Sequence, residues 1–145
     1  MNPGWWARRR AGEDRGHLEL FYAGTVLLAF LIIGLVIDVG TALNTRSEAY
    51  YTAQEAARAG AQQLDAGEAI SGDAIVVDPD GAQAAARAFL DGQSVDGDVS
   101  VSADGKSLNV TVHDHHEPIF ASLLGIGQIP VTGHGSATLL HQPGG

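Results

Sequence analysis

The chain has 145 residues, the size of one ordinary domain, and contains no cysteine. Disulfides and thiolate metal sites are therefore excluded. The formal net charge is −9, and residues 41–145 carry four basic against thirteen acidic side chains. Because an acidic surface repels phosphate backbones, we expect no nucleic acid as a partner of this region.

Residues 1–17 form a basic arm that holds Arg8, Arg9, Arg10 and Arg15, whereas only Arg46 lies close behind the apolar run that follows. Basic residues flank transmembrane helices mainly on the cytoplasmic side. This asymmetry predicts a cytoplasmic N-terminus, with the C-terminal region outside the cytoplasmic membrane. A twin-arginine signal is disfavoured because AGED follows the arginines.

The apolar run reads FYAGTVLLAFLIIGLVI from Phe21 to Ile37 and has no charge. With Leu18 and Leu20 it reaches about twenty residues, enough for a helix to cross a hydrocarbon layer of about 30 Å. We therefore predict a transmembrane helix over residues 18–39. A cleaved signal peptide would need a shorter run and a small-residue cleavage site, which VIDVGTALN does not provide.

Glu19 is the one acidic residue at the inner edge of this run. A carboxylate is costly in the hydrocarbon and less so near its edge. One interpretation is that Glu19 extends into the inner head groups. The other is that it pairs with a cation on another subunit, and position alone leaves both open.

Residues 40–66 are rich in alanine and contain no proline, and apolar residues recur at every seventh position from Leu43 to Leu64. This spacing predicts a helix that continues the membrane span to about Asp65, with a break at Gly40 as the alternative. Small residues allow helix backbones to approach closely. We expect Ala53, Ala57 and Gly60 to pack against neighbouring subunits.

Residues 67–145 are expected to form a small α+β domain. A loop over 66–72 and a short strand over 75–77 precede Asp78-Pro79, which is typical of a helix start. An Ala-rich helix is predicted over 80–90, and a turn-rich connection over 92–98. Residues 118–124 are predicted as a short apolar helix or a loop.

A β-hairpin is the strongest local prediction in this domain. Val99 and Val101 alternate with serines, Asp104-Gly105 is a two-residue turn signal, and alternation resumes at Leu108. A last strand over 129–140 carries small residues on one side, which predicts a helix lying close to the sheet. The fold class is therefore a long N-terminal helix followed by a three- or four-stranded, mainly antiparallel sheet with one or two short helices.

The cluster His113, His115, His116 and Glu117 is the one constellation with metal-ligand chemistry. Consecutive polar residues before a proline also suit a solvated loop, which is the favoured interpretation. The acidic turns at 78–81 and 96–98 lack the spacing of a calcium loop. No nucleophile elbow, phosphate loop or dinucleotide motif occurs, so we expect no enzyme, cofactor or small-molecule substrate.

The order of features resembles the TadE/TadG-like family of Flp (tight-adherence) pilus assembly. The residues that carry the resemblance are Arg15-Gly16, Glu19, the acidic-glycine exit Asp38-Val39-Gly40, and the helix Ala53–Gly60. The later segments VDPDGAQAAARAFL and PIFASLLGIGQIPVTGHGSATLL resemble small members of the same family. The resemblance implies a pilin-like fold.

The resemblance also implies a non-enzymatic minor pilin or pseudopilin that assembles with pilin-like subunits through its N-terminal helix. Glu19 and Asp38 would then act between subunits. Processing after Gly16 would leave His17 as the new N-terminus, although Glu19 lies three residues after Gly16 where prepilin motifs place five. The alternative from another class is a membrane-tethered binding module, with metal held through His113–Glu117.

Overall fold

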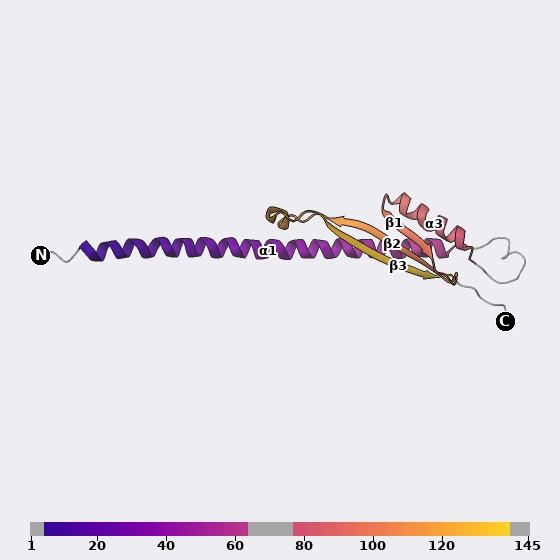
Figure 1. The fold of residues 1–145 in the computed structure, drawn as a ribbon, viewed down its shortest axis with the longest axis horizontal. Helices are drawn as coiled ribbons and strands as arrows, with labels where there is room; N and C mark the ends of the chain where they lie inside the picture. The colour runs from indigo at the N-terminus through magenta and orange to yellow at the C-terminus, as the bar shows by residue number, and fades with distance from the viewer. Residues whose placement is uncertain (1–4, 64–76, 140–145) are drawn as a thin grey trace, which may run out of the picture.

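The computed structural model describes residues 5–63 and 77–139, with side chains from Gly16 onward. Its elements, in chain order, are α1 (Trp5–Ala61), α3 (Pro79–Gly92), β1 (Asp96–Val101), β2 (Ser107–His116), the 3₁₀ helix η1 (Ala121–Leu124) and β3 (Ile129–Thr138). Figure 1 shows α1 as a long rod, with the sheet and α3 laid along its C-terminal part. The predicted α+β fold is confirmed.

Helix α1 runs without interruption for 57 residues. At 1.5 Å per residue it is about 85 Å long. It continues through Gly40, so the unbroken form of the two predicted alternatives is confirmed. The helix contains no proline, and the hydroxyls of Thr25 and Thr41 donate back to carbonyls four residues earlier. It ends at Ala61, four residues before the predicted end.

The first half of α1 carries apolar side chains that no other described part of the chain covers. Leu20, Phe21 and Leu27 are each more than 60% exposed. Among the described residues, α1 is the one helix long and apolar enough to cross a membrane. Such a surface needs lipid or protein around it, since monomeric soluble proteins rarely expose an apolar area of this extent.

Helix α3 begins where the sequence predicted and extends two residues further, to Gly92. The carboxylate of Asp78 accepts hydrogen bonds from the backbone N–H groups of Asp80 and Gly81 at 3.1 and 3.0 Å. Pro79 occupies the first turn, where its missing N–H costs nothing. The apolar side of α3, with Ala82, Ala86 and Leu90, is buried.

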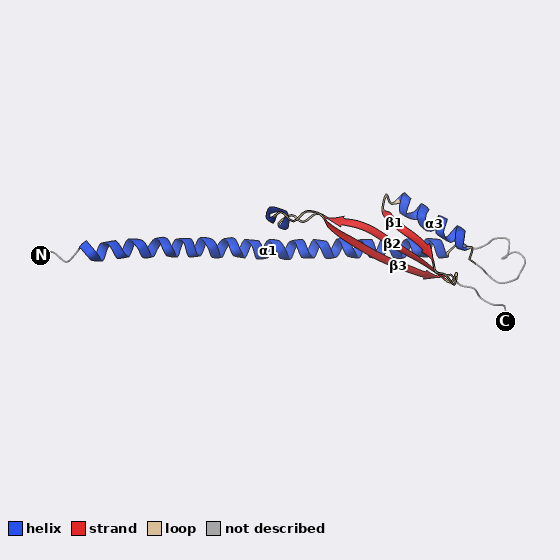
Figure 2. Cartoon of the chain, in the orientation of Figure 1, coloured by secondary structure: helices blue, strands red, loops and turns tan. Residues whose placement is uncertain are grey.

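The sheet has the order β1-β2-β3, and both pairs are antiparallel (Figure 2). Two strands are longer than predicted. β1 already begins at Asp96, which pairs with His113, so the segment expected to be a turn is partly strand. β2 continues to His116, which pairs with Ile129. The sequence did not predict these extensions, because their residues are polar. Local composition does not show that a segment pairs with a neighbouring strand.

The β1–β2 hairpin is confirmed, but its loop is longer than the predicted two-residue turn. Ser102 and Ser107 face each other, with the Ser102 N–H donating to the Ser107 carbonyl at 2.8 Å. The Gly105 N–H closes a tighter turn on the Ser102 carbonyl. Gly105 has φ 71°, a conformation that glycine adopts without strain. A four-residue loop of this kind is a common hairpin connection.

Helices α1 and α3 cover one face of the sheet, and the other face is polar. The covered face presents Leu108, Val110 and Val112 from β2, and Val131, Gly133 and Gly135 from β3. A methyl group at Gly133 or Gly135 would collide with the backbone of Ala49 or Ala53. The predicted close approach of a helix to the small residues of the last strand is therefore confirmed.

The C-terminal part of α1 and the predicted domain over 67–145 share one core. Alanines of α1 and α3 meet the valines and Leu108 of the sheet. The predicted loop over 66–72 lies outside the described residues. Of the predicted strand over 75–77 only Val77 is described, in a single bridge, and Leu140 at the end of the last predicted strand also lies outside.

Candidate assembly surface and membrane-proximal site

The small-residue stripe of α1 is packed against the chain's own fold. Ala53 and Ala57 are fully buried. A methyl group at Gly60 would collide with the Leu108 side chain and approach the Ala82 carbonyl. We expected this stripe to meet neighbouring helices, but its close partners are the chain's own sheet and α3. In this fold the three residues present no surface to another subunit.

Among the described residues, Asp38 is the one buried carboxylate, and it lies near the end of the apolar run. Its exposed fraction is 4%. One carboxylate oxygen accepts from the Ile119 N–H at 2.8 Å, and the other from Phe120 and Ala121 at 2.9 and 2.6 Å. Three donors and no acceptor match the acceptor-only character of an ionised carboxylate. Asp38 therefore fixes the start of η1 against α1.

The β2–β3 loop, residues 117–128, lies beside α1, and Figure 1 shows it reaching past the sheet toward the N-terminal end of the helix. The ring of Phe120 covers Gly34, where an added methyl group would collide with it. His116, at the base of the loop, is buried and lies 3.4 Å from the Thr41 hydroxyl through Nε2. Gly34, Asp38 and Thr41 thus form one docking line on α1, spaced by about one helical turn.

The histidine cluster lies in and directly after a strand, and the prediction of a solvated loop was wrong. His113, His115 and His116 lie in β2, and Glu117 follows directly. Nε2 of His113 lies 2.9 Å from the Asp98 carboxylate on β1, whereas His116 points to the helix side. Glu117 accepts from the side-chain amide of Gln128 at 2.7 Å. Within residues 16–63 and 77–139, no group of three or more His, Cys, Asp or Glu is arranged to hold a metal.

One side of the C-terminal half of α1 carries an exposed aromatic strip. Tyr50 and Tyr51 are 48% and 66% exposed, with their rings in edge contact, and Leu43 is 57% exposed. Together with Arg46 and Ser47 they line a shallow hollow on the helix. We call Leu43, Ser47, Tyr50 and Tyr51 the tyrosine face. It is continuous along α1 with the apolar surface of the membrane segment.

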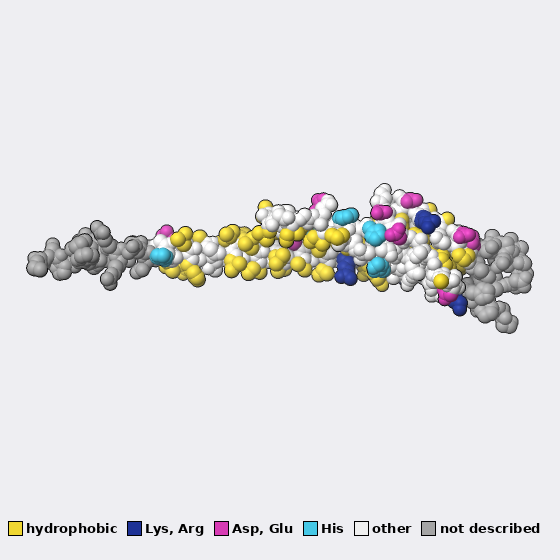
Figure 3. All heavy atoms as spheres, in the orientation of Figure 1, with side chains coloured by type: hydrophobic (Ala, Val, Ile, Leu, Met, Phe, Trp, Pro, Cys, Tyr) yellow, Lys and Arg dark blue, Asp and Glu magenta, His cyan; other side chains and the backbone are white. Residues whose placement is uncertain are grey.

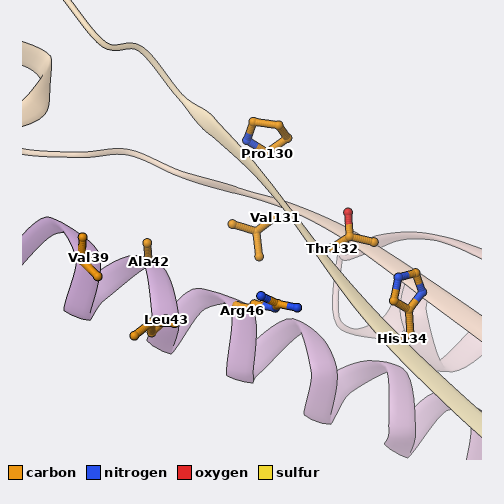
Figure 4. A pocket seen from close by; sticks show the side chains of 8 residues that line it. All are labelled: Val39, Ala42, Leu43, Arg46, Pro130, Val131, Thr132 and His134. Carbon is orange, nitrogen blue, oxygen red and sulfur yellow. The ribbon is translucent and has the colours of Figure 1, made fainter.

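A second hollow lies between α1 and the start of β3 (Figure 4). Val39, Ala42 and Leu43 of α1 and Pro130 and Val131 of β3 give it apolar walls. Arg46, Thr132 and His134 line its other part. The hollow is therefore apolar at its end near Val39 and Pro130, and polar at its other end, near Arg46 and His134.

The candidate residues near the N-terminal end of the apolar run are all accessible. Gly16 has open space around it, and His17 and Glu19 are exposed on the helix. Processing after Gly16 and an intersubunit pair at Glu19 remain predictions.

Figure 3 shows hydrophobic side chains gathered along the middle of the rod and charged ones over the sheet and α3.

Sequence reasoning named Asp38 and missed its partner. The signal was available in part: from Pro118 to Gly133 the chain has no charged residue or histidine, within an otherwise acidic domain. A glycine at position 34 inside a bulky apolar run was a second sign of close packing. The contact itself joins residues more than eighty positions apart, which local patterns do not encode.

Comparison with known proteins supports the resemblance found in the sequence. Neither the search of curated proteins nor the search of solved structures found a match. A family model described as putative Flp pilus-assembly TadE/G-like matches residues 20–63. This stretch is α1 from Leu20 to its end, with two further residues, and includes none of the sheet. Residues 20–63 of this chain are thus similar to sequences of the TadE/G-like pilus-assembly family.

Proposed function

We propose that this chain is a non-enzymatic subunit, similar to a minor pilin or pseudopilin, of a Tad/Flp-type pilus or a related secretion machine. It is anchored by the first half of α1, with the N-terminus in the cytoplasm and the sheet domain outside. Its partners are the membrane and pilin-like subunits. The family match over residues 20–63 supports the pilus-related, membrane-anchored part of this role.

The observation that carries the proposal is the division of α1 into covered and bare surfaces. In the extracytoplasmic half, the sheet covers the small-residue side and leaves the tyrosine face exposed. In the membrane half, nearly the whole circumference is bare. A helix with a continuous bare side from membrane to head is suited to lateral packing with another long helix. Tyrosine and leucine provide large contact area there at low entropic cost.

Co-purification with pilin-like subunits tests this function. Substitution of glutamate for both Tyr50 and Tyr51 would place two charges in the proposed helix contact, and buried unpaired charges are strongly unfavourable. We expect this variant to insert into the membrane and to lose its pilin-like partners. The matched control is Asn109→Glu, on the polar face of the sheet. Equal recovery of partners with both variants would refute assembly through the tyrosine face.

A further inference from the structure

We propose that the β2–β3 loop, residues 117–128, is a second membrane-contacting element, inserted into the outer lipid leaflet beside α1. The proposal requires that α1 spans a membrane with its N-terminus on the inner side, and it is independent of the pilus role. Its occupant is lipid: the acyl chains and glycerol region of the leaflet that surrounds the outer end of the helix.

The loop's position along α1 is the first argument. Phe120 packs on Gly34 and the start of η1 on Asp38. Gly34 lies three residues before Ile37, the end of the uncharged run, which is about 4.5 Å toward the membrane centre. A loop docked at this level of a membrane-spanning helix cannot remain in bulk water. It is held at the depth where the hydrocarbon begins.

The loop's composition is the second argument. Its outward side chains are large and apolar: Ile119, Leu123, Leu124 and Ile126 are 64%, 78%, 65% and 47% exposed. Covering them is worth about 25 cal/mol per Å² of apolar area removed from water. No charged residue lies in the loop beyond Glu117, and the Glu117–Gln128 hydrogen bond closes its base. The loop thus has a polar base and an apolar tip.

Asp38 is the third argument. A bare carboxylate at this position would set the outer limit of the hydrocarbon at Ile37. The three loop N–H groups surround it instead, and the same bonds satisfy backbone donors that lipid cannot. Once Asp38 is covered, the stretch from Phe21 to Thr45 exposes no charge on α1. The loop base, where His116 meets Thr41, then marks the outer boundary.

This boundary has a consequence for the inner end of the helix. Counting about twenty residues back from Thr41 places the inner edge of the hydrocarbon near Tyr22. Glu19 then lies among the inner head groups. The polar lining of the second hollow, at Arg46 and His134, lies beyond the outer boundary and faces the outer head groups and water.

The absence of cysteine allows a direct test with single-cysteine variants of the full chain. An environment-sensitive fluorophore is attached at Leu123→Cys, in protein reconstituted into phospholipid vesicles. The controls are Ile32→Cys in the membrane segment and Asn109→Cys on the polar face of the sheet; all three native side chains are exposed. Quenching is measured with lipids carrying a nitroxide near the carbonyl end of the acyl chain, and with aqueous iodide.

We expect lipid nitroxide to quench the fluorophore at position 123 several-fold more than the one at 109, and iodide to show the reverse order. Iodide quenching at 123 equal to that at 109 would place the loop in water and overturn the proposal. Protection from both quenchers would also overturn it, because a second copy of the chain, and not lipid, would then cover the loop. Dilution of the protein in the vesicles identifies that case, since protection by a second copy is lost.

Discussion

Asp38 accepts a hydrogen bond from the backbone N–H of Ala121 at 2.6 Å, across 83 positions of the chain. This bond and the two from Ile119 and Phe120 join the end of the apolar run of α1 to the β2–β3 loop. Hydrogen bonds to an ionised carboxylate are stronger than hydrogen bonds between neutral groups. Asp38 therefore holds the β2–β3 loop at a fixed level on α1.

Asp38→Ala should release the loop from α1. Three backbone N–H groups would lose their acceptor, at about 1–3 kcal/mol for each donor left buried and unpaired. We expect η1 to detach from α1, because the three N–H groups can then form hydrogen bonds with water. With the fluorophore at position 123, we expect a change in quenching and faster proteolysis between residues 117 and 128. Asp114→Ala is the control, because Asp114 accepts from the adjacent His115 N–H and from no other described residue. An unchanged loop in Asp38→Ala would show that Phe120 on Gly34 suffices for docking.

Gly135→Ala should separate the sheet from α1. The added methyl group would collide with the backbone of Ala53, and backbone atoms on both sides cannot move without breaking the ladder or the helix. Overpacking of this kind costs about 1–3 kcal/mol. We expect a lower midpoint of thermal unfolding in detergent micelles. Gly127→Ala, which meets open space, is the matched control, and equal midpoints for the two variants would contradict the packing described.

The hairpin loop should make a pH-dependent contribution to stability through Asp104. Hydrogen bonds from the Ser102 hydroxyl and the Lys106 N–H lower the pKa of the Asp104 carboxyl below its ordinary value of 3.8. A carboxyl whose pKa is lower in the folded state stabilises that state above the unfolded pKa, and the contribution is lost as pH falls through the folded pKa. The stability difference between wild type and Asp104→Asn should therefore be present at neutral pH and shrink below pH 3.8. Denaturant titrations at several pH values measure it, and a gap that widens on acidification would show the opposite sign.

Glu19→Gln tests the role of the carboxylate at the N-terminal end of the apolar run. If Glu19 pairs with a cation on a neighbouring subunit, the neutral variant should insert normally and lose part of its incorporation, while Glu19→Asp retains some. The N-terminal mass of the extracted protein shows whether the cation is an amine at His17 or another group. Assembly of Glu19→Gln at the wild-type level would leave Glu19 as a carboxylate among the inner head groups.

The sequence predicted those elements whose signals are local. The α1 helix, the Asp78 cap of α3, the β1–β2 hairpin and the small residues of β3 all follow from spacing, capping and turn chemistry within a few residues. The sequence did not predict which elements pack against each other. Ala53 and Gly60 were correctly recognised as a close-packing stripe, but the partner is the chain's own sheet. Residues of β2 that looked like a solvated loop became strand because β1 and β3 pair with them.

The central claim is that the chain assembles through the bare side of α1 while its sheet occupies the other side. In-cell cross-linking measures this most directly, with a bifunctional thiol reagent on Tyr50→Cys and, as control, Ser136→Cys on the polar face of the sheet. The account predicts an adduct between position 50 and a cysteine placed in the N-terminal helix of a pilin-like subunit, and none at position 136. Equal adducts at both positions, or none at 50 while the subunits still co-purify, would contradict it.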